Sequence, residues 1–351
     1  MIYPVSPATA APAEYSKTIS GKGKEPNMAD QTRRSFLKHS LYTGSALLTA
    51  RFAPLDALAR NLPPGFRLPG ARMRFGLVTY LWAKDWDLNT ILKNCEKTRV
   101  LGVELRTQHA HHVETDLSPD RRREIKKRFK DSPVIYVGPG CNFDFHHLNA
   151  SDVKKNIEGA KAYAKLSYDC GGSGVKVKPN NLPKQVSVDQ TCEQIGKALN
   201  VVGQYAADYG QEIRVEVHGS GTSDLPVMKK IFDHVGEPNV GVCWNCNNQD
   251  LAGQGLEYNF NLVKKRFGHT CHVRELNLGK YPYQQLMNLF VKMDYQGWIL
   301  LEARTKPKDP IKALIEQREV FEKMIAQAQK QPGLKPVKIQ KESPGPDKPI
   351  A

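Results

Sequence analysis

Ionisable side chains follow short apolar segments at several places in the sequence. Glu216 and His218 alternate with Val215 and Val217, and a period of two places the polar side chains on one side of a β-strand. The same change from apolar to polar residues occurs at 174–178, 240–245, 269–274 and 298–304. Several strands that present ionisable groups at the same ends indicate one shared site.

Four of these strand-end residues form a ligand set for a divalent metal ion. Glu216 and Glu302 offer carboxylates, His272 offers an imidazole and Asn245 offers an amide oxygen. Strand ends with a purely structural role would more often carry Val, Ile or Leu. The convergence of four polar residues therefore favours a functional site.

The elements that must position these residues are eight strand-then-helix units. We predict strands at 74–80, 102–106, 133–137, 173–178, 212–217, 239–244, 269–273 and 298–303. Helices are predicted near 87–100, 118–130, 151–167, 187–209, 224–235, 256–267, 282–294 and 309–329, and several begin with Ser or Asp as a cap. This alternation predicts a (β/α)8 TIM barrel. A doubly wound open sheet is the alternative, but no Gly-rich dinucleotide fingerprint follows the first strand.

The chain is expected to have four parts. In residues 1–59, the segment Thr32–Lys38 contains paired arginines and precedes a mildly apolar stretch and a small-x-small cleavage site, the parts of a twin-arginine export signal. This predicts a periplasmic protein, with translation beginning at Met28 rather than Met1. Residues 60–72 are expected to be a linker, 73–329 the barrel, and 330–351 a disordered Pro/Lys-rich tail.

The composition excludes some partners and leaves others open. The net charge is +15, and residues 1–59 carry seven Lys/Arg against four acidic residues, so part of the excess lies outside the barrel. The basic residues of the barrel do not alternate with aromatic ones, so we expect no nucleic-acid partner. No run is long enough for a membrane span after signal cleavage. The seven cysteines suggest core thiols rather than a disulfide framework or a redox pair at Cys243 and Cys246.

The pattern resembles the sugar phosphate isomerase/epimerase family, the xylose-isomerase-like TIM barrels. The resemblance covers about 73–327 and is carried by Val-Glu216-Val-His218-Gly, Val-Gly-Val-Cys-Trp-Asn245, His272-Val-Arg274-Glu275 and Leu-Leu-Glu302. It implies that Glu216, Asn245, His272 and Glu302 bind one divalent cation, commonly Mn, Mg, Co or Zn. Asn245 replaces the family's usual Asp, and Asn248 replaces its histidine, so the metal ligands carry two formal negative charges instead of three.

The mechanism that the resemblance implies is proton abstraction next to a carbonyl group of a sugar. Glu216 and Glu302 would face opposite sides of the substrate as acid and base. The remaining strand-end residues would contact the substrate: Glu104, Arg106, His109, Lys176, Lys178, His218 and Arg274. For the lysines, the alternative is a solvated salt-bridge cluster with Glu104, because lysines facing into a barrel are costly unless paired. For His109, the alternative is packing in the core or a lid.

Export favours a free or oxidised sugar, such as a keto-sugar, because phosphorylated sugars are scarce outside the cytoplasm. The same enolisation step can end in elimination, so a sugar lyase or dehydratase is an alternative to an isomerase or epimerase. A sugar-binding barrel without catalysis is a third interpretation, supported by Asn245. An abasic-site endonuclease is less favoured, since it would be expected to need ligands for several metals. Homo-oligomerisation is left open.

Overall fold

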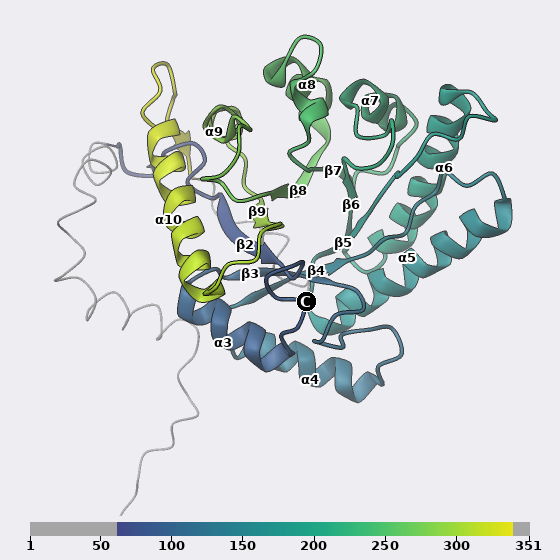
Figure 1. The fold of residues 1–351 in the computed structure, drawn as a ribbon, viewed down its shortest axis with the longest axis horizontal. Helices are drawn as coiled ribbons and strands as arrows, with labels where there is room; N and C mark the ends of the chain where they lie inside the picture. The colour runs from purple at the N-terminus through teal and green to yellow at the C-terminus, as the bar shows by residue number, and fades with distance from the viewer. Residues whose placement is uncertain (1–61, 340–351) are drawn as a thin grey trace, which may run out of the picture. The chain divides into compact units, whose positions relative to one another are not determined.

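Eight parallel strands close into a barrel at the centre of residues 62–339, the part of the chain that this computed structural model describes (Figure 1). The strands are β2 Arg74–Val78, β3 Gly102–Arg106, β4 Ile135–Gly140, β5 Gly174–Val177, β6 Glu212–Glu216, β7 Val240–Trp244, β8 Phe267–Val273 and β9 Trp298–Leu301. Each pairs with its neighbours in sequence, and β9 pairs with β2 to close the ring. The predicted (β/α)8 fold is confirmed.

A helix follows each strand and lies outside the barrel (Figure 1). The helices are α3 Leu88–Thr98, α4 Pro119–Lys130, α5 Ala150–Cys170, α6 Val188–Ala207, α7 Leu225–Asp233, α8 Leu256–Val263, α9 Tyr283–Lys292 and α10 Pro310–Ala328. Short 3₁₀ helices, η1 Asn248–Leu251 and η2 Lys264–Arg266, flank α8. Ser118 caps α4 as predicted, by accepting a hydrogen bond from the amide of Arg121.

Among the element boundaries that differ from the sequence prediction, two are explained by tertiary pairing. Strand β4 extends to Gly140, because Gly138, Pro139 and Gly140 pair with β3 although none of them favours a strand in isolation. The helix predicted at 256–267 ends at Val263, and β8 begins at Phe267 after one 3₁₀ turn. Tertiary pairing overrides local propensity at both places.

The barrel interior is polar, in contrast to the branched apolar layers that usually fill a TIM barrel. Ile213, Val215 and Val217 belong to the large apolar core, whereas the alternate residues of β6, Arg214 and Glu216, are buried polar groups. A small apolar cluster of Val78, Val137, Trp298 and Leu300 is separate from the large core. The interior therefore has to satisfy buried charges by specific pairing.

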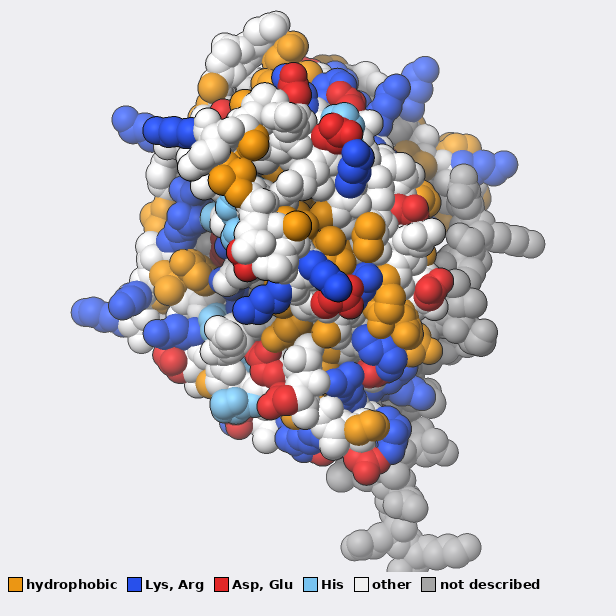
Figure 2. Space-filling view, turned by 90° about the vertical axis from the view of Figure 1, so that its right-hand side faces the viewer, with side chains coloured by type: hydrophobic (Ala, Val, Ile, Leu, Met, Phe, Trp, Pro, Cys, Tyr) orange, Lys and Arg blue, Asp and Glu red, His pale blue; other side chains and the backbone are white. Residues whose placement is uncertain are grey.

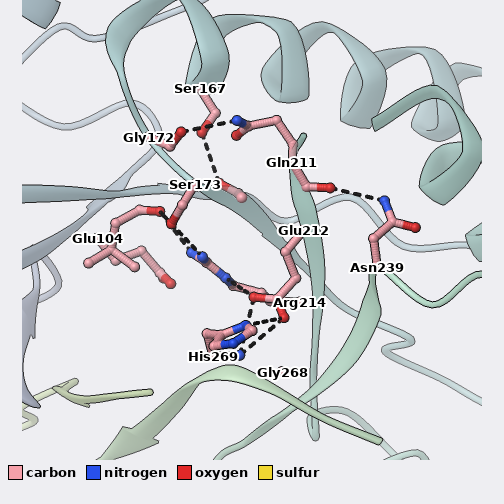
Figure 3. A network of polar contacts seen from close by, with 12 residues as sticks. Glu104, Ser167, Gly172, Ser173, Gln211, Glu212, Arg214, Asn239, Gly268 and His269 are labelled. Atoms are coloured by element: carbon pink, nitrogen blue, oxygen red, sulfur yellow. Dashed lines mark hydrogen bonds and ion pairs between the residues drawn. The ribbon is translucent and has the colours of Figure 1, made fainter. Parts of the chain in front are cut away.

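Arg214 organises the amino end of this interior (Figure 3). Its guanidinium donates to Glu212 Oε2, to the carbonyl of Val137 and to Ser173 Oγ, each at 2.8 Å. Glu212 also contacts His269, whose Nδ1 is 2.9 Å from Oε1. Burial alone would raise the pKa of Glu212, but His269 and Arg214 lower it to about 2. This network fixes β4, β5, β6 and β8 to one another below the predicted site.

A two-stranded ladder joins the segment that precedes the barrel in the sequence to the segment that follows it. Strand β1, Phe66–Arg67, pairs antiparallel with β10, Val337–Lys338. Arg67 also forms two 2.6 Å hydrogen bonds to Asp294, between α9 and β9. Parts of the segments expected to be linker and tail are therefore ordered by pairing with each other. This contact joins residues far apart in the sequence and has no local pattern.

None of the described helices is long and apolar enough to cross a membrane. On the face drawn in Figure 2, Lys/Arg and Asp/Glu side chains are interspersed, with hydrophobic side chains between them. All seven cysteines are free and buried, which confirms them as core thiols. The segment Thr32–Lys38, predicted to be the export signal, lies outside the described residues.

Candidate metal and active site

Three of the four predicted metal ligands converge at the carboxyl ends of their strands. Glu216 ends β6, His272 lies near the end of β8, and Glu302 directly follows β9. One ligand atom from each lies within 4.8 Å of the other two, and all three side chains are buried. An ion with bonds of about 2.0–2.4 Å can bridge groups at this separation.

Asn245 is the fourth predicted ligand, and the strand register places it beside His272. It follows Trp244, which pairs with Cys271, the residue before His272. The side chain is only 3% exposed, and its Nδ2 has no hydrogen-bond partner among the described residues. Asn248, three residues further along the chain, is exposed at the start of η1.

Glu104 contacts His272 at its Nε2 atom. The Nε2 of His272 is 3.2 Å from Glu104 Oε2, while Nδ1 is buried, has no hydrogen-bond partner in the described chain and is 3.9 Å from Glu216 Oε1. Gly140 makes room for this carboxylate, because a Cβ at that position would be 2.5 Å from Glu104 Oε1. A histidine held by a carboxylate at one nitrogen presents the other nitrogen to a metal. Glu104 is thus in a position to orient a ligand.

Lys176 forms a buried ion pair with Glu216. Its Nζ lies 2.7 Å from Glu216 Oε2, and both side chains are almost inaccessible to solvent. Burial alone would raise the pKa of Glu216, but the Lys176 ammonium, with His272, lowers it below its ordinary value. Burial would likewise lower the pKa of Lys176, but Glu216 raises it. The expected alternative for Lys176, a solvated cluster with Glu104, is wrong, since its hydrogen-bonded partner is Glu216 and neither group is solvated.

The residues present fit a divalent ion. Oε2 of Glu216 is bonded to Lys176, whereas Oε1 lies on the side of His272. Nδ1 of His272 is buried and has no hydrogen-bond partner in the described chain, so a bound ion would satisfy it. Two carboxylates and one imidazole suit Mn²⁺, Co²⁺ or Zn²⁺, with Asn245 near enough in register to add an amide oxygen.

Three of the other predicted substrate residues lie near this centre and are half-buried. Lys178 interacts electrostatically with Lys176, Glu216, Arg106 and Glu302, and burial, followed by Lys176, lowers its pKa. Arg106 donates to Asn142 at 3.1 Å. Burial also lowers the pKa of His218, although Glu216 acts to raise it.

The two remaining residues lie at the strand ends with less contact to the ligands. Arg274 is half-buried after β8, and its backbone amide donates to Tyr283. His109 is in the loop after β3, where burial and then Arg106 lower its pKa. Arg274 interacts electrostatically with Asp250 and Tyr283 instead, so neither its side chain nor that of His109 has an observed contact with the candidate ligands among the described residues.

Glu275 fixes the loop that carries Glu302. Its Oε1 accepts hydrogen bonds from the amides of Arg304 and Thr305 and from the Thr305 hydroxyl, at 3.0, 2.7 and 2.6 Å. The indole of Trp82 donates to the carbonyl of Thr305 at 3.0 Å. Trp82 is therefore held by a loop contact and is buried.

The sequence analysis did not identify a second cluster. Asp144, His146 and His147 lie in the loop after β4 with ligand atoms within 4.8 Å of one another. The run Asp-Phe-His-His in a predicted loop was the available signal. These residues carry no strand periodicity, because they lie in the loop between β4 and α5.

The comparisons with known proteins identify the class. The family described as "Xylose isomerase-like TIM barrel" matches residues 92–324, and the chain belongs to that family. The sequence matches no curated protein significantly.

Solved structures with the same fold are distant in sequence. The 3-keto-D-glucoside 4-epimerase of E. coli is 14% identical, with a TM-score of 0.59 over 72% of this chain and 99% of that chain. The IOLI protein with a bound zinc atom is 13% identical, with a TM-score of 0.62 over 73% and 99%. A probable 3-DHS dehydratase from Bacillus anthracis is 14% identical, with a TM-score of 0.58 over 71% and 99%. Other similar structures include an L-ribulose 3-epimerase, a D-allulose 3-epimerase from Methylomonas sp. and a D-tagatose 3-epimerase-like protein. At these identities the likeness establishes the fold.

Proposed function

We propose that the protein is a divalent-metal-dependent sugar isomerase or epimerase that removes a proton next to a carbonyl group. The observation that carries the proposal is the convergence of Glu216, His272 and Glu302, with ligand atoms within 4.8 Å of one another, at the barrel mouth. Family membership and the epimerases among the similar structures support it. The bound ion would supply Lewis acidity toward the substrate's oxygen atoms.

Glu216 and Glu302 are proposed as the base and acid. Lys176 keeps Glu216 ionised, which is the state that accepts a proton, although the same ammonium makes Glu216 a weaker base. Glu275 and Thr305 hold the loop behind Glu302 and so restrict where that carboxylate can lie. Burial of both carboxylates strengthens their interactions with any charge that develops on the substrate.

The residues beside the candidate ligands bear on the kind of substrate. Arg106, Lys178 and His218 place hydrogen-bond donors there, which suits the hydroxyl and carbonyl oxygens of a sugar. We propose a free or keto-sugar rather than a sugar phosphate, in line with the proposed export of the protein to the periplasm. The activity of the similar E. coli protein, a 3-keto-D-glucoside 4-epimerase, gives a specific substrate to test.

A sugar lyase or dehydratase is the second candidate. The fold likeness to the probable 3-DHS dehydratase supports it, and elimination can follow the same proton abstraction. An epimerase returns a proton to the same carbon, whereas a lyase releases water or another leaving group. Product analysis therefore separates the two activities with one set of substrates.

Solvent deuterium uptake tests the shared first step. The full chain would be stripped with a chelator, reloaded with Mn²⁺, Co²⁺ or Zn²⁺, and incubated in D₂O with 3-keto-glucosides and free ketoses. We expect metal-dependent uptake at the carbon beside the carbonyl, reduced by about 10²–10⁴-fold in Glu302→Gln. Glu257→Gln, an exposed change on α8, is the control and should retain full activity. Absence of uptake with every metal and sugar, or full activity in Glu302→Gln, would contradict the proposal.

A further inference from the structure

The loop between β4 and α5 gathers three metal-ligating side chains around one oxygen atom. Nε2 of His147 is 2.6 Å from Asp144 Oδ1, and Nδ1 of His146 is 3.7 Å from the same oxygen. The two imidazole rings are stacked, with centroids 4.4 Å apart. Two adjacent histidines thus direct nitrogen atoms toward one carboxylate.

The other oxygen of Asp144 is fixed by a neighbouring loop. Asn180 donates from Nδ2 to Asp144 Oδ2 at 2.8 Å. Asn180 has a positive φ of 73° and bridges to Gly219, where a Cβ would be 1.9 Å from the Asn180 carbonyl oxygen. The amide is therefore held in place by its own backbone. A carboxylate anchored in this way at one oxygen is positioned to offer the other oxygen to an ion.

Hydrogen bonding within the described chain leaves the cluster incomplete. Nδ1 of His146 is buried and has no hydrogen-bond partner among residues 62–339. Asp144 Oδ1 is already close to His147, and the 3.7 Å separation from His146 is too long for a hydrogen bond. A buried nitrogen without a partner loses its solvation by water and gains no hydrogen bond in return. A cation between the three atoms would satisfy His146.

We propose that Asp144, His146 and His147 bind one divalent cation of the Zn²⁺ type. The site shares no residue with the cluster of Glu216, His272 and Glu302. Two imidazoles and one carboxylate favour Zn²⁺, Co²⁺ or Ni²⁺ over Mg²⁺ or Ca²⁺.

The cation would keep an open position. His146 and His147 line a cavity of about 550 Å³, together with Leu148, Asn149, Asp152, residues 181–185 and Ser220. Zinc centres with three protein ligands commonly take water or a ligand oxygen as the fourth. The cavity gives such an oxygen access to the ion.

Metal stoichiometry tests the site without reference to catalysis. The full chain would be stripped with a chelator and titrated with Zn²⁺ by calorimetry and with Co²⁺ by absorption. We expect two equivalents in the wild type and one in the double variant His146→Gln/His147→Gln. The matched control changes two exposed histidines, His112→Asn/His234→Gln, and should retain two equivalents.

Two further variants keep the result interpretable. Asn180→Gly removes the amide that anchors Asp144 but tolerates the positive φ, and should weaken the second equivalent by about 10–100-fold. Glu302→Gln affects only the first cluster and should leave binding at the second cluster unchanged. The count of two rests on the proposed function, whereas the loss of one equivalent between wild type and the His146→Gln/His147→Gln variant does not, so the two failures can be told apart. Unchanged stoichiometry in the His146/His147 variant, or unchanged affinity in Asn180→Gly, would overturn the proposal.

Discussion

Replacing Lys176 by Met tests how the barrel mouth balances its charge. Removing one partner of a buried ion pair costs about 3–5 kcal/mol, because the other charge stays buried without compensation. Lys176 and Glu216 are 2.7 Å apart and nearly inaccessible to solvent, so the full effect applies. A domain of this size loses about 2–4 °C in Tm per kcal/mol. We therefore expect Lys176→Met to lower the Tm by about 6–20 °C in the presence of a chelator.

A divalent ion should reverse much of this loss. In the wild type the ammonium repels the ion, by about 4 kcal/mol for unit charges 4 Å apart at an effective dielectric constant of 20. Without Lys176, Glu216 is available to the ion at both oxygens, so the variant should bind Mn²⁺ or Zn²⁺ more tightly than the wild type. Excess ion at about 100 Kd stabilises the wild type by about 2.7 kcal/mol and should stabilise the variant by more. The Tm difference between the two proteins should therefore shrink.

Differential scanning fluorimetry of the full chain, with chelator and with excess ion, measures both effects. Lys178→Met is the matched control: Lys178 lies two residues away, is half-buried, and has no carboxylate within ion-pair distance in the described chain. It should change the Tm by much less, and about equally under both conditions. The reasoning is refuted if Lys176→Met lowers the Tm equally with and without the ion, or if it is as stable as the wild type in chelator.

Three other substitutions separate stability from metal binding. Glu212 has a pKa lowered from 4.5 to about 2, so its stabilising contribution of about 3 kcal/mol is present above pH 4.5 and is lost as the pH falls toward 2. Urea unfolding should show a gap between wild type and Glu212→Gln that closes over this range, and a constant gap would contradict it. Asn245→Asp adds a third carboxylate and should raise divalent-ion affinity at least about tenfold in a competition titration with a chromophoric chelator; a weaker affinity would exclude Asn245 from the ligand set. Glu104→Gln should lower that affinity by about 10–100-fold while leaving kcat at saturating metal less affected, and a loss of kcat alone would place Glu104 in the chemistry instead.

The sequence was sufficient to predict the barrel and the strand ends that form the site. Period-two alternation marks which side chains share a face, and this placed Glu216, His272 and Glu302 correctly at the ends of their strands. Arg214 shares the face of Glu216 but lies one pleat earlier, in the network at the amino end of the barrel. Alternation gives the face of a residue, and the depth depends on where the strand enters the barrel.

Pairing between strands could not be read from local pattern. Lys176 lies on β5 and Glu104 on β3, and only the stagger of the closed barrel determines that Lys176 contacts Glu216 while Glu104 contacts His272. The cluster around Asp144 depends on how one loop packs against another, through Asn180. All three contacts join residues that are far apart in the sequence, so no periodicity in the sequence predicts them.

The ladder between β1 and β10 has a practical consequence for handling the protein. The amide of Ile339 donates to the carbonyl of Gly65 at 2.7 Å, so the two ends of the described chain are neighbours. Arg67 attaches this pair to Asp294, just before β9 begins, which is the side of the barrel opposite the mouth. Affinity tags or fusion partners joined at either border would start away from the candidate site, and a short peptide linking residues 65 and 339 would permit circularly permuted variants with the same barrel mouth.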